Sequence, residues 1–127
     1  MKYLSDYIEK AQSQAINKAD GFFAFGDEQF NEAKKDKLKY THLGAGLICN
    51  KEKAKILIKE LDEIIKAGIA QDVKENGIIN IIKRELSNHE AGYTGDITDT
   101  AEALKDYPIK KEKILEIFKS ENKAFAN

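Results

Sequence analysis

The strongest constraint on the fold is a run of apolar residues that are spaced for a helix between residues 54 and 69. The run consists of Ala54, Leu57, Ile58, Leu61, Ile64, Ile65 and Ile69. Steps of three and four residues place these side chains on one helix face and keep that face apolar for about four turns. Asn50 precedes the run and is a favoured helix cap. We therefore expect a long core helix that starts near Asn50 and buries Leu61.

Weaker patterns of the same kind predict further helices. They cover residues 2–18, 78–91 and 109–123, with shorter helical segments after Asp27 and around residues 101–104. Asp27 can cap its helix, which should then turn Phe30 and Ala33 inward. The last helix should bury Ile114, Leu115, Ile117 and Phe118. Residues 34–39 and 92–95 are expected to be loops.

Two stretches favour β-structure. Phe22, Phe23 and Phe25 crowd into four positions beside glycine, which favours a buried strand. The segment 40–49 has β-type residues at both ends and Gly44-Ala45-Gly46 in the middle, which indicates a bent strand or two short strands joined by a turn. We therefore expect an α+β fold, with four to five helices packed on a two- or three-stranded antiparallel sheet. An all-α fold is the alternative if the aromatic run is irregular.

Length and charge narrow the class of protein. A chain of 127 residues is the size of one domain, and its formal net charge of −1 provides no global attraction for nucleic acid. Arg84 is the single arginine among 21 basic residues, so little bidentate recognition of phosphate or guanine is available. We expect no binding to duplex DNA. No stretch has the length and apolarity of a signal peptide or a membrane span, and no membrane partner is expected.

The single cysteine, Cys49, excludes an intramolecular disulfide. Small secreted domains usually rely on several disulfides, so we expect a cytoplasmic protein. Cys49 follows two apolar residues and has no activating neighbour on its own segment, which predicts a buried and unreactive thiol.

The densest polar cluster lies between residues 85 and 99. Its candidate binding residues are Glu85, Asn88, His89, Glu90, Tyr93, Asp96 and Asp99. On a helix, His89 falls within an apolar stripe and Glu85 lies one turn earlier, where a carboxylate could orient the imidazole. A metal ligand or general base would need Asp96 and Asp99 to fold back and complete the site.

A structural role for His89 is favoured over a catalytic one. The segment lacks a second histidine, a cysteine partner and an established ligand spacing. We expect a largely buried ring whose nitrogens bond to a backbone group or to Tyr93, Asp96 or Asp99. No catalytic residue, metal ion or cofactor is predicted, and the chain is expected to act by binding.

Three other features have both a structural and a functional interpretation. The glycines at 44–46 could approach a phosphate, but the spacing of known phosphate loops is missing, so a turn or bulge is favoured. The phenylalanines at 22–30 could stack on bases, but core packing is favoured because no basic residues are interleaved with them. The lysines at 34–39 could form a stripe that binds phosphates, but Asp36 interrupts them, so a solvated surface is favoured.

Three sequence blocks together resemble an uncharacterised family of small proteins that is encoded mainly in bacteriophages and prophages. The blocks are FFAF with QF at 22–30, GAG at 44–46, and ELSNHE at 85–90 followed by YT at 93–94 and residues 96–104. The resemblance implies an accessory protein of a phage or mobile element. Small proteins of that kind often bind and disable a host component.

The expected function is therefore inhibition of a host defence system, of the anti-CRISPR kind, by binding a host protein in the host cytoplasm. Two alternatives remain open at this point. One is a protein that sequesters a small molecule or nucleotide, and the other is a small metal-dependent hydrolase centred on His89. A homodimer is also left open.

Overall fold

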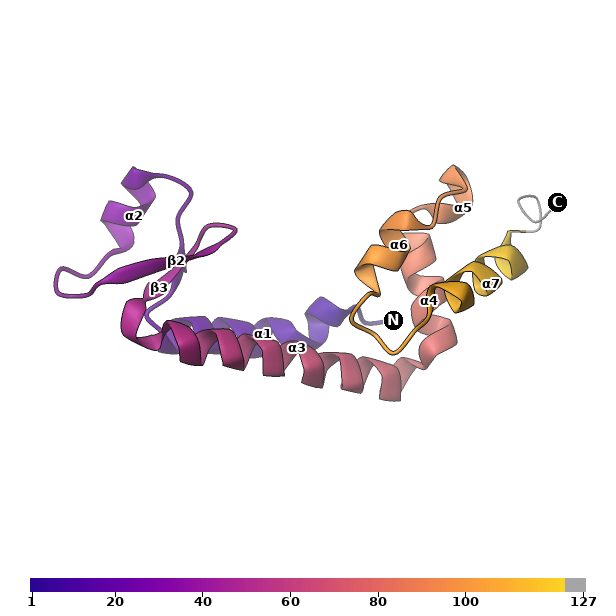
Figure 1. Ribbon diagram of the computed structural model, residues 1–127, viewed down its shortest axis with the longest axis horizontal. Coiled ribbons are helices and arrows are strands. Elements are labelled where there is room, and N and C mark those ends of the chain that lie inside the picture. Colours follow the sequence, from indigo (N-terminus) through magenta and orange to yellow (C-terminus); the bar gives the residue numbers. More distant parts are fainter. Residues whose placement is uncertain (123–127) are drawn as a thin grey trace. The chain divides into compact units, whose positions relative to one another are not determined.

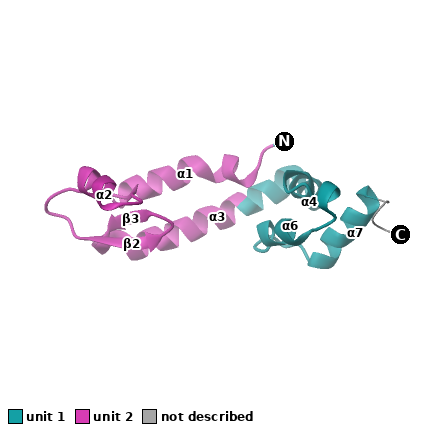
Figure 2. Ribbon diagram, turned by 90° about the horizontal axis from the view of Figure 1, so that it is seen from above, with its two compact units in different colours: residues 1, 69–127 teal, residues 2–68 magenta. Residues whose placement is uncertain are grey.

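A computed structural model describes residues 1–122 and divides the chain into two compact units (Figure 1, Figure 2). Unit 2 comprises residues 2–68, and unit 1 comprises Met1 with the residues from Ile69 onward. Over the described residues the chain forms seven α-helices and one three-stranded antiparallel sheet, which confirms the α+β class. Helix α3, Ala54–Asn76, contributes its first part to unit 2 and its last part to unit 1.

Unit 2 is built on a pair of antiparallel helices, α1 (Leu4–Lys18) and the first part of α3. At one end the Lys18 ammonium lies 3.3 Å from a carboxylate oxygen of Glu60. Toward the other end Ile8 packs directly on Gly68, where a Cβ atom would stand only 2.2 Å from the Ile8 side chain. Gly68 therefore allows the two helices to approach closely at that point.

The sheet of unit 2 has the strand order β1-β3-β2, with β1 at Phe22–Phe23, β2 at Tyr40–Gly44 and β3 at Leu47–Asn50. Both pairings are antiparallel, and the register shifts between His42 and Gly44. The segment 40–49 is thus two short strands joined by a glycine turn, which is one of the two alternatives that the sequence left open. The aromatic segment pairs with the later strand, β3.

Both faces of the sheet are covered within unit 2. On one face Phe22 meets Phe30 of α2 (Asp27–Ala33), with ring centroids 6.1 Å apart, and both rings contact Tyr40. On the other face Leu47 and Cys49 join a core with residues of α1 and α3, namely Ala15, Ala19 and Leu57. All four residues of β3 are consequently buried, although successive side chains of a strand point to opposite faces.

Several local expectations for unit 2 are wrong. The aromatic strand ends at Phe23, and both Phe23 and Phe25 are exposed because no element covers their outer sides. In α2, Phe30 packs against Phe22 as expected, but Ala33 is exposed, because it is the last residue of this short helix. Leu61 is also half-buried, because it lies at the edge of the face that α1 covers.

The expected capping and burial at the ends of β3 are confirmed. The Asn50 side chain accepts a hydrogen bond from the Glu52 amide at 3.0 Å and starts a single 3-10 turn, Lys51–Lys53, which leads into α3. Cys49 is fully buried, and burial raises the pKa of its thiol. The thiol therefore stays protonated at neutral pH and acts as a small apolar group in the core.

Unit 1 consists of the last part of α3 and four shorter helices. These are α4 at Ile78–Asn88, α5 at Ala91–Thr94, α6 at Thr98–Ala103 and α7 at Lys111–Glu121. Helix α4 packs against the three others. The unit's fully buried side chains include Ile81, Ile82, Leu104 and Ile114. Gly77 separates α3 from α4 with a φ of 78°, a conformation that side-chain-bearing residues rarely adopt.

Three expectations for unit 1 need correction. The expected loop at residues 92–95 is largely the short helix α5, which starts at Ala91 because that residue is buried and anchors the turn. Leu115 is 39% exposed, since it lies beside the buried stripe of α7 rather than in it. The expected end of the last helix at Lys123 lies outside the described residues. Within residues 1–122, no helix has the length and apolarity that a membrane crossing requires.

The core of unit 2 yields a first prediction. Leu57 is 1% exposed and Leu61 is only half-buried. Leu57→Ala should lower the free energy of unfolding by about 2–5 kcal/mol, because it removes fully buried methyl groups and leaves a cavity. Leu61→Ala should cost clearly less. Urea unfolding of both variants checks this, and an equal or larger loss for Leu61→Ala would contradict the packing described.

Candidate functional site

The structure spreads the predicted polar cluster over different environments. Glu85 is buried, and His89 is partly exposed at the end of α4, with 29% of its side chain accessible. The other members of the cluster are exposed: Asn88, Glu90, Tyr93, Asp96 and Asp99. Tyr93 is the most exposed of the large apolar or aromatic residues in the described chain, at 90%. These residues form a polar surface rather than one convergent site.

His89 approaches Glu85, as the sequence predicted, but not the other expected partners. Its Nε2 atom lies 3.8 Å from a Glu85 carboxylate oxygen. That distance is too long for a hydrogen bond but short enough for attraction when the imidazole is protonated. The expectation of a largely buried ring, bonded to a backbone group or to Tyr93, Asp96 or Asp99, is wrong, because α4 ends at Asn88 and the ring just beyond that end stays partly exposed.

Asp96 has a local structural role. Its carboxylate accepts hydrogen bonds from the amide of Thr98 at 2.9 Å and from the Thr98 hydroxyl at 2.6 Å, at the start of α6. These bonds hold the pKa of Asp96 below its usual value. Over residues 1–122, no three histidine, cysteine, aspartate or glutamate side chains converge where they could hold a metal ion.

Unit 1 contains a buried network of polar side chains around Arg84 and Asp72 that the sequence did not predict. Arg84 of α4 makes two parallel hydrogen bonds of 2.9 Å to the two carboxylate oxygens of Asp72 in α3. Its Nε also donates to Glu85 at 2.6 Å. The side chains of Arg84 and Asp72 are only 4% and 0% exposed. The single arginine therefore joins two carboxylates inside the unit.

Further donors complete the environment of Asp72. The Tyr107 hydroxyl donates to it at 2.5 Å and the Asn76 amide at 2.8 Å. Burial raises the pKa of Asp72, but the hydrogen bonds from Arg84, Tyr107 and Asn76 outweigh burial and lower the pKa overall. Burial and the same contact with Asp72 raise the pKa of Tyr107. Every buried side-chain nitrogen and oxygen in the described chain has a partner, so this network serves to hold α3, α4 and the Tyr107 segment together.

Two sequence signals could have revealed this network. Asp72 continues the apolar stripe of α3 at three residues beyond Ile69, where a charged side chain needs a buried partner. Arg84 is the one guanidinium in a chain that otherwise uses lysine, and arginine is the cation best suited to a buried carboxylate. Spacing alone does not reveal which carboxylate pairs with it.

The hydrogen bond from Tyr107 provides a test of the network. Tyr107→Phe keeps the buried ring but removes a hydrogen bond to a charged group, which should lower the free energy of unfolding by about 1.5–3 kcal/mol. The matched control Tyr93→Phe changes an exposed hydroxyl and should stay within about 0.5 kcal/mol of the original protein. Thermal or urea unfolding measures both, and equal effects would contradict the assignment.

The lowered pKa of Asp72 also predicts a pH dependence. A carboxyl whose pKa is lower in the folded than in the unfolded state stabilises the fold above the unfolded value and loses this contribution as the pH falls. The free energy of unfolding should therefore decrease below about pH 5. Asp72→Asn should be less stable at pH 7 and show a shallower decrease on acidification. A variant with the same acid dependence as the original protein would disprove the contribution.

Unit 2 has a different feature, an apolar groove between α1 and α3. It has a volume of about 230 Å³ and is lined by Ala15, Lys18, Ala19, Lys53, Ile56, Leu57 and Glu60. The groove exists because α1 presents two alanines to α3 at this end, and their short side chains leave space. Ile56 stands on its rim with 62% of its surface exposed. We call this feature the interhelical groove.

Charged groups edge the interhelical groove. The Lys18–Glu60 ion pair spans from α1 to α3, and the Lys53 ammonium lies 3.3 Å from the Lys18 carbonyl oxygen. The volume of the groove falls below the range of about 300–1,000 Å³ that is usual for small-molecule sites. An apolar floor with a polar rim is instead the anatomy of an anchor site for one side chain of a protein partner.

Comparison with known proteins gives a family but no activity. A family model described as a family of unknown function, DUF7659, matches residues 4–124. The chain belongs to this family. No curated protein and no solved structure shows a significant match to the chain. The function of this DUF7659 member must therefore be inferred from its surfaces and buried groups.

Proposed function

We propose that this DUF7659 protein is an accessory protein of a phage or mobile element that inhibits a host defence system by binding a host protein. The interhelical groove of unit 2 carries the proposal. It combines an apolar floor, an exposed isoleucine and a charged rim on a rigid pair of helices. The blocks at 22–30, 44–46 and 85–104, which resemble a family encoded by phages and prophages, support the biological setting.

Burial of Ile56 is the main energetic contribution that this groove offers. Full burial of an isoleucine side chain gains about 1.5–3 kcal/mol, and Ile56 is 62% exposed in the free protein. The surrounding ion pair is worth little by itself, because the Lys18 side chain is 74% exposed. The role proposed for the Lys18–Glu60 ion pair is instead to exclude water from Ile56 and to fix the orientation of the partner.

The hydrolase alternative has less support. A hydrolase centred on His89 would need further donors that converge on its imidazole. Asp96 instead binds its own helix start, and Glu85 is engaged by Arg84. The polar segment at 85–99 thus offers an exposed surface and a structural anchor, and within the described residues no three histidine, cysteine, aspartate or glutamate side chains converge where they could hold the metal ion of a hydrolase.

Capture from a bacterial lysate tests the proposal with a matched pair of variants. Ile56→Glu places a charge in the groove, whereas Ile58→Glu places the same charge on an isoleucine of similar exposure, 54% against 62%, that does not line the groove. The original protein and Ile58→Glu should retain the same host protein, and Ile56→Glu should lose it by tenfold or more. Circular dichroism confirms that both variants are folded.

A second assay measures the inhibition itself. The protein is expressed in a host whose defence system restricts a test phage, and the plating efficiency of that phage is counted. Plating should rise with the original protein and with Ile58→Glu, but not with Ile56→Glu. The proposal would be wrong if no host protein were retained and a nucleotide co-purified instead, or if both variants behaved alike.

A further inference from the structure

A second surface of unit 2 has a concentrated positive charge. Residues 34–55 contain seven lysines against Asp36 and Glu52, a formal charge of +5, while the whole chain carries −1. The charge is therefore strongly uneven, although the total is close to neutral. An uneven distribution of this kind acts on anionic partners locally, within about 8 Å at physiological salt.

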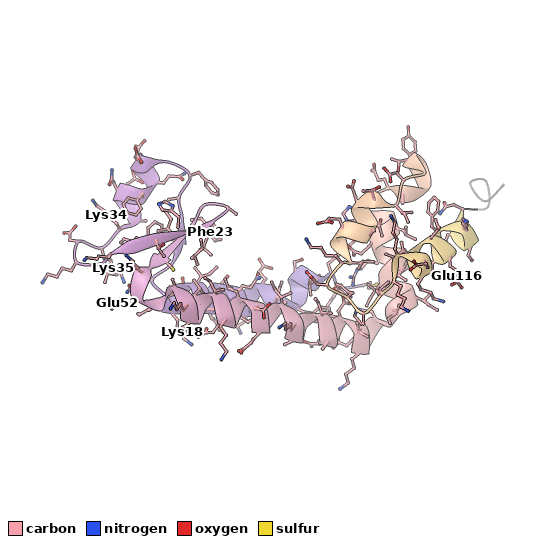
Figure 3. The ribbon with its side chains drawn as sticks, viewed as in Figure 1. Lys18, Phe23, Lys34, Lys35, Glu52 and Glu116 are labelled. Carbon is pink, nitrogen blue, oxygen red and sulfur yellow. The ribbon has the colours of Figure 1, made fainter. Side chains whose placement is uncertain are left out.

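The structure brings these lysines together from different segments. Lys35 and Lys53 lie 3.2 and 3.1 Å from the two carboxylate oxygens of Asp20. The Lys51 amide donates to the Lys39 carbonyl oxygen at 2.9 Å. Figure 3 shows Lys34 and Lys35 at the same end of unit 2 as Lys18. One basic edge is thus formed where the sheet meets α3, and its lysines outnumber its acidic groups.

Asp20 fixes this edge in place. Its side chain accepts hydrogen bonds from Asn50, Lys53 and Lys35, and these lower the pKa of Asp20 to about 2. Asp20 itself has a φ of 54°, in the left-handed region, where aspartate is tolerated better than most residues. The carboxylate therefore stays ionised and positions two of the lysines.

Unit 2 also has a hollow that is larger than the interhelical groove. It has a volume of about 510 Å³ and lies between α2 and the sheet, lined by Ala24, Phe25, Gly26, Asp27, Phe30, His42, Gly46 and Ile48. This volume falls within the range of small-ligand sites. The lining offers two aromatic rings, an imidazole and a carboxylate, which suits a flat ring with a polar edge. We call it the aromatic hollow.

Two contacts hold Phe25 so that one face of its ring stays exposed for a ligand. The Phe25 backbone amide donates to the Gln29 side-chain oxygen at 2.7 Å, and the Phe25 ring packs directly on Gly46. A Cβ atom at position 46 would lie 2.3 Å from the ring, so only glycine allows this placement. Phe25 nevertheless remains 77% exposed. An aromatic ring fixed from one side and open on the other is a stacking platform.

The aromatic hollow and the basic edge are connected. Phe30 lines the hollow, and the Lys34 ammonium lies 6.0 Å from the centre of the Phe30 ring. The Lys35 amide donates to the hydroxyl of Tyr40, whose ring packs against Phe30. Phe25 lies beside Gly46 at the start of β3, and Lys51 follows the other end of that strand, so a strand of several nucleotides with one base on Phe25 would run along the sheet toward the ammonium groups.

We propose that unit 2 binds single-stranded nucleic acid, with one base stacked on Phe25 in the aromatic hollow and phosphates farther along the strand on the basic edge. Positive charge next to exposed aromatic rings is the combination that single-strand binding proteins use. The several lysines beyond the hollow favour a strand over a free nucleotide, because a strand carries a phosphate at every step. Duplex DNA is excluded, because its bases stay stacked on one another.

Fluorescence polarisation of a fluorescein-labelled U15 RNA tests this inference with the full-length chain. Phe25→Ser should weaken binding by tenfold or more, since it removes the stacking platform. Tyr93→Ser, which removes an even more exposed aromatic ring from unit 1, should bind like the original protein. Phe25 contributes little to the core, so Phe25→Ser should remain folded.

A pair of double variants tests the charges. Lys34→Gln with Lys37→Gln leaves the partners of Asp20 intact and removes two charges from the edge. It should weaken binding and reduce the slope of log affinity against log salt by about 1.4, because each phosphate contact to a single strand contributes about 0.7. Lys110→Gln with Lys111→Gln removes two lysines of unit 1 and should change neither quantity.

Four outcomes would overturn the inference. The first is no polarisation change with U15 at about 0.05 M salt, where phosphate contacts are strongest. The second is unchanged binding by Phe25→Ser, and the third is equal binding of a 15-base-pair duplex. The fourth is full competition by uridine monophosphate at the same concentration as the strand. The last would indicate a free-nucleotide site. Because Ile56 does not line the hollow, Ile56→Glu should still bind U15, so this inference and the proposed protein contact fail independently.

Discussion

The buried ion pair between Arg84 and Asp72 is the interaction on which unit 1 depends. It joins α3 to α4, and through the Tyr107 hydroxyl it also fixes the segment between α6 and α7. Two carboxylates and one guanidinium are desolvated there, which is costly unless every donor and acceptor is matched. Because they are matched, the network stabilises one arrangement of these helices and penalises alternatives that would leave a buried charge unpaired.

The same network explains why the polar segment at 85–99 is a poor catalytic candidate. Glu85, the carboxylate nearest to His89, already accepts a hydrogen bond from Arg84 at 2.6 Å. Its backbone oxygen also accepts a bond from the buried Thr100 hydroxyl at 3.3 Å. The dense polar composition thus arises from a buried anchor on one side and helix starts and solvated residues on the other. The surfaces that we propose for partners lie in unit 2, where Phe25 and Ile56 are exposed.

Local sequence patterns predicted the helices and the glycine turn well, because those features depend on neighbours in sequence. They failed where the outcome depends on which element covers a face. Phe22 and Phe30 are packed as expected, whereas Phe23 and Phe25 are exposed, although all four are phenylalanines of the same short sequence segment. Leu61 likewise follows the stripe of Leu57, yet only Leu57 is fully covered.

The basic edge and the interhelical groove, our two proposed binding surfaces, could not be predicted from the sequence for the same reason. The lysines at 34–39 are diluted by Asp36 in sequence, but they gain Lys51 and Lys53 through the sheet. The interhelical groove depends on Ala15 and Ala19 facing α3, and helical spacing identifies them only as core residues. A three-dimensional juxtaposition of ordinary residues produces both surfaces.

Hydrogen–deuterium exchange of the protein with and without its captured host partner tests whether the partner binds in the interhelical groove. If the partner occupies the interhelical groove, the amides around Lys18 and from Lys53 to Glu60 should exchange more slowly in the complex, and those at 85–99 should be unchanged. Slower exchange confined to residues 85–99, with no change at the groove, would contradict the account.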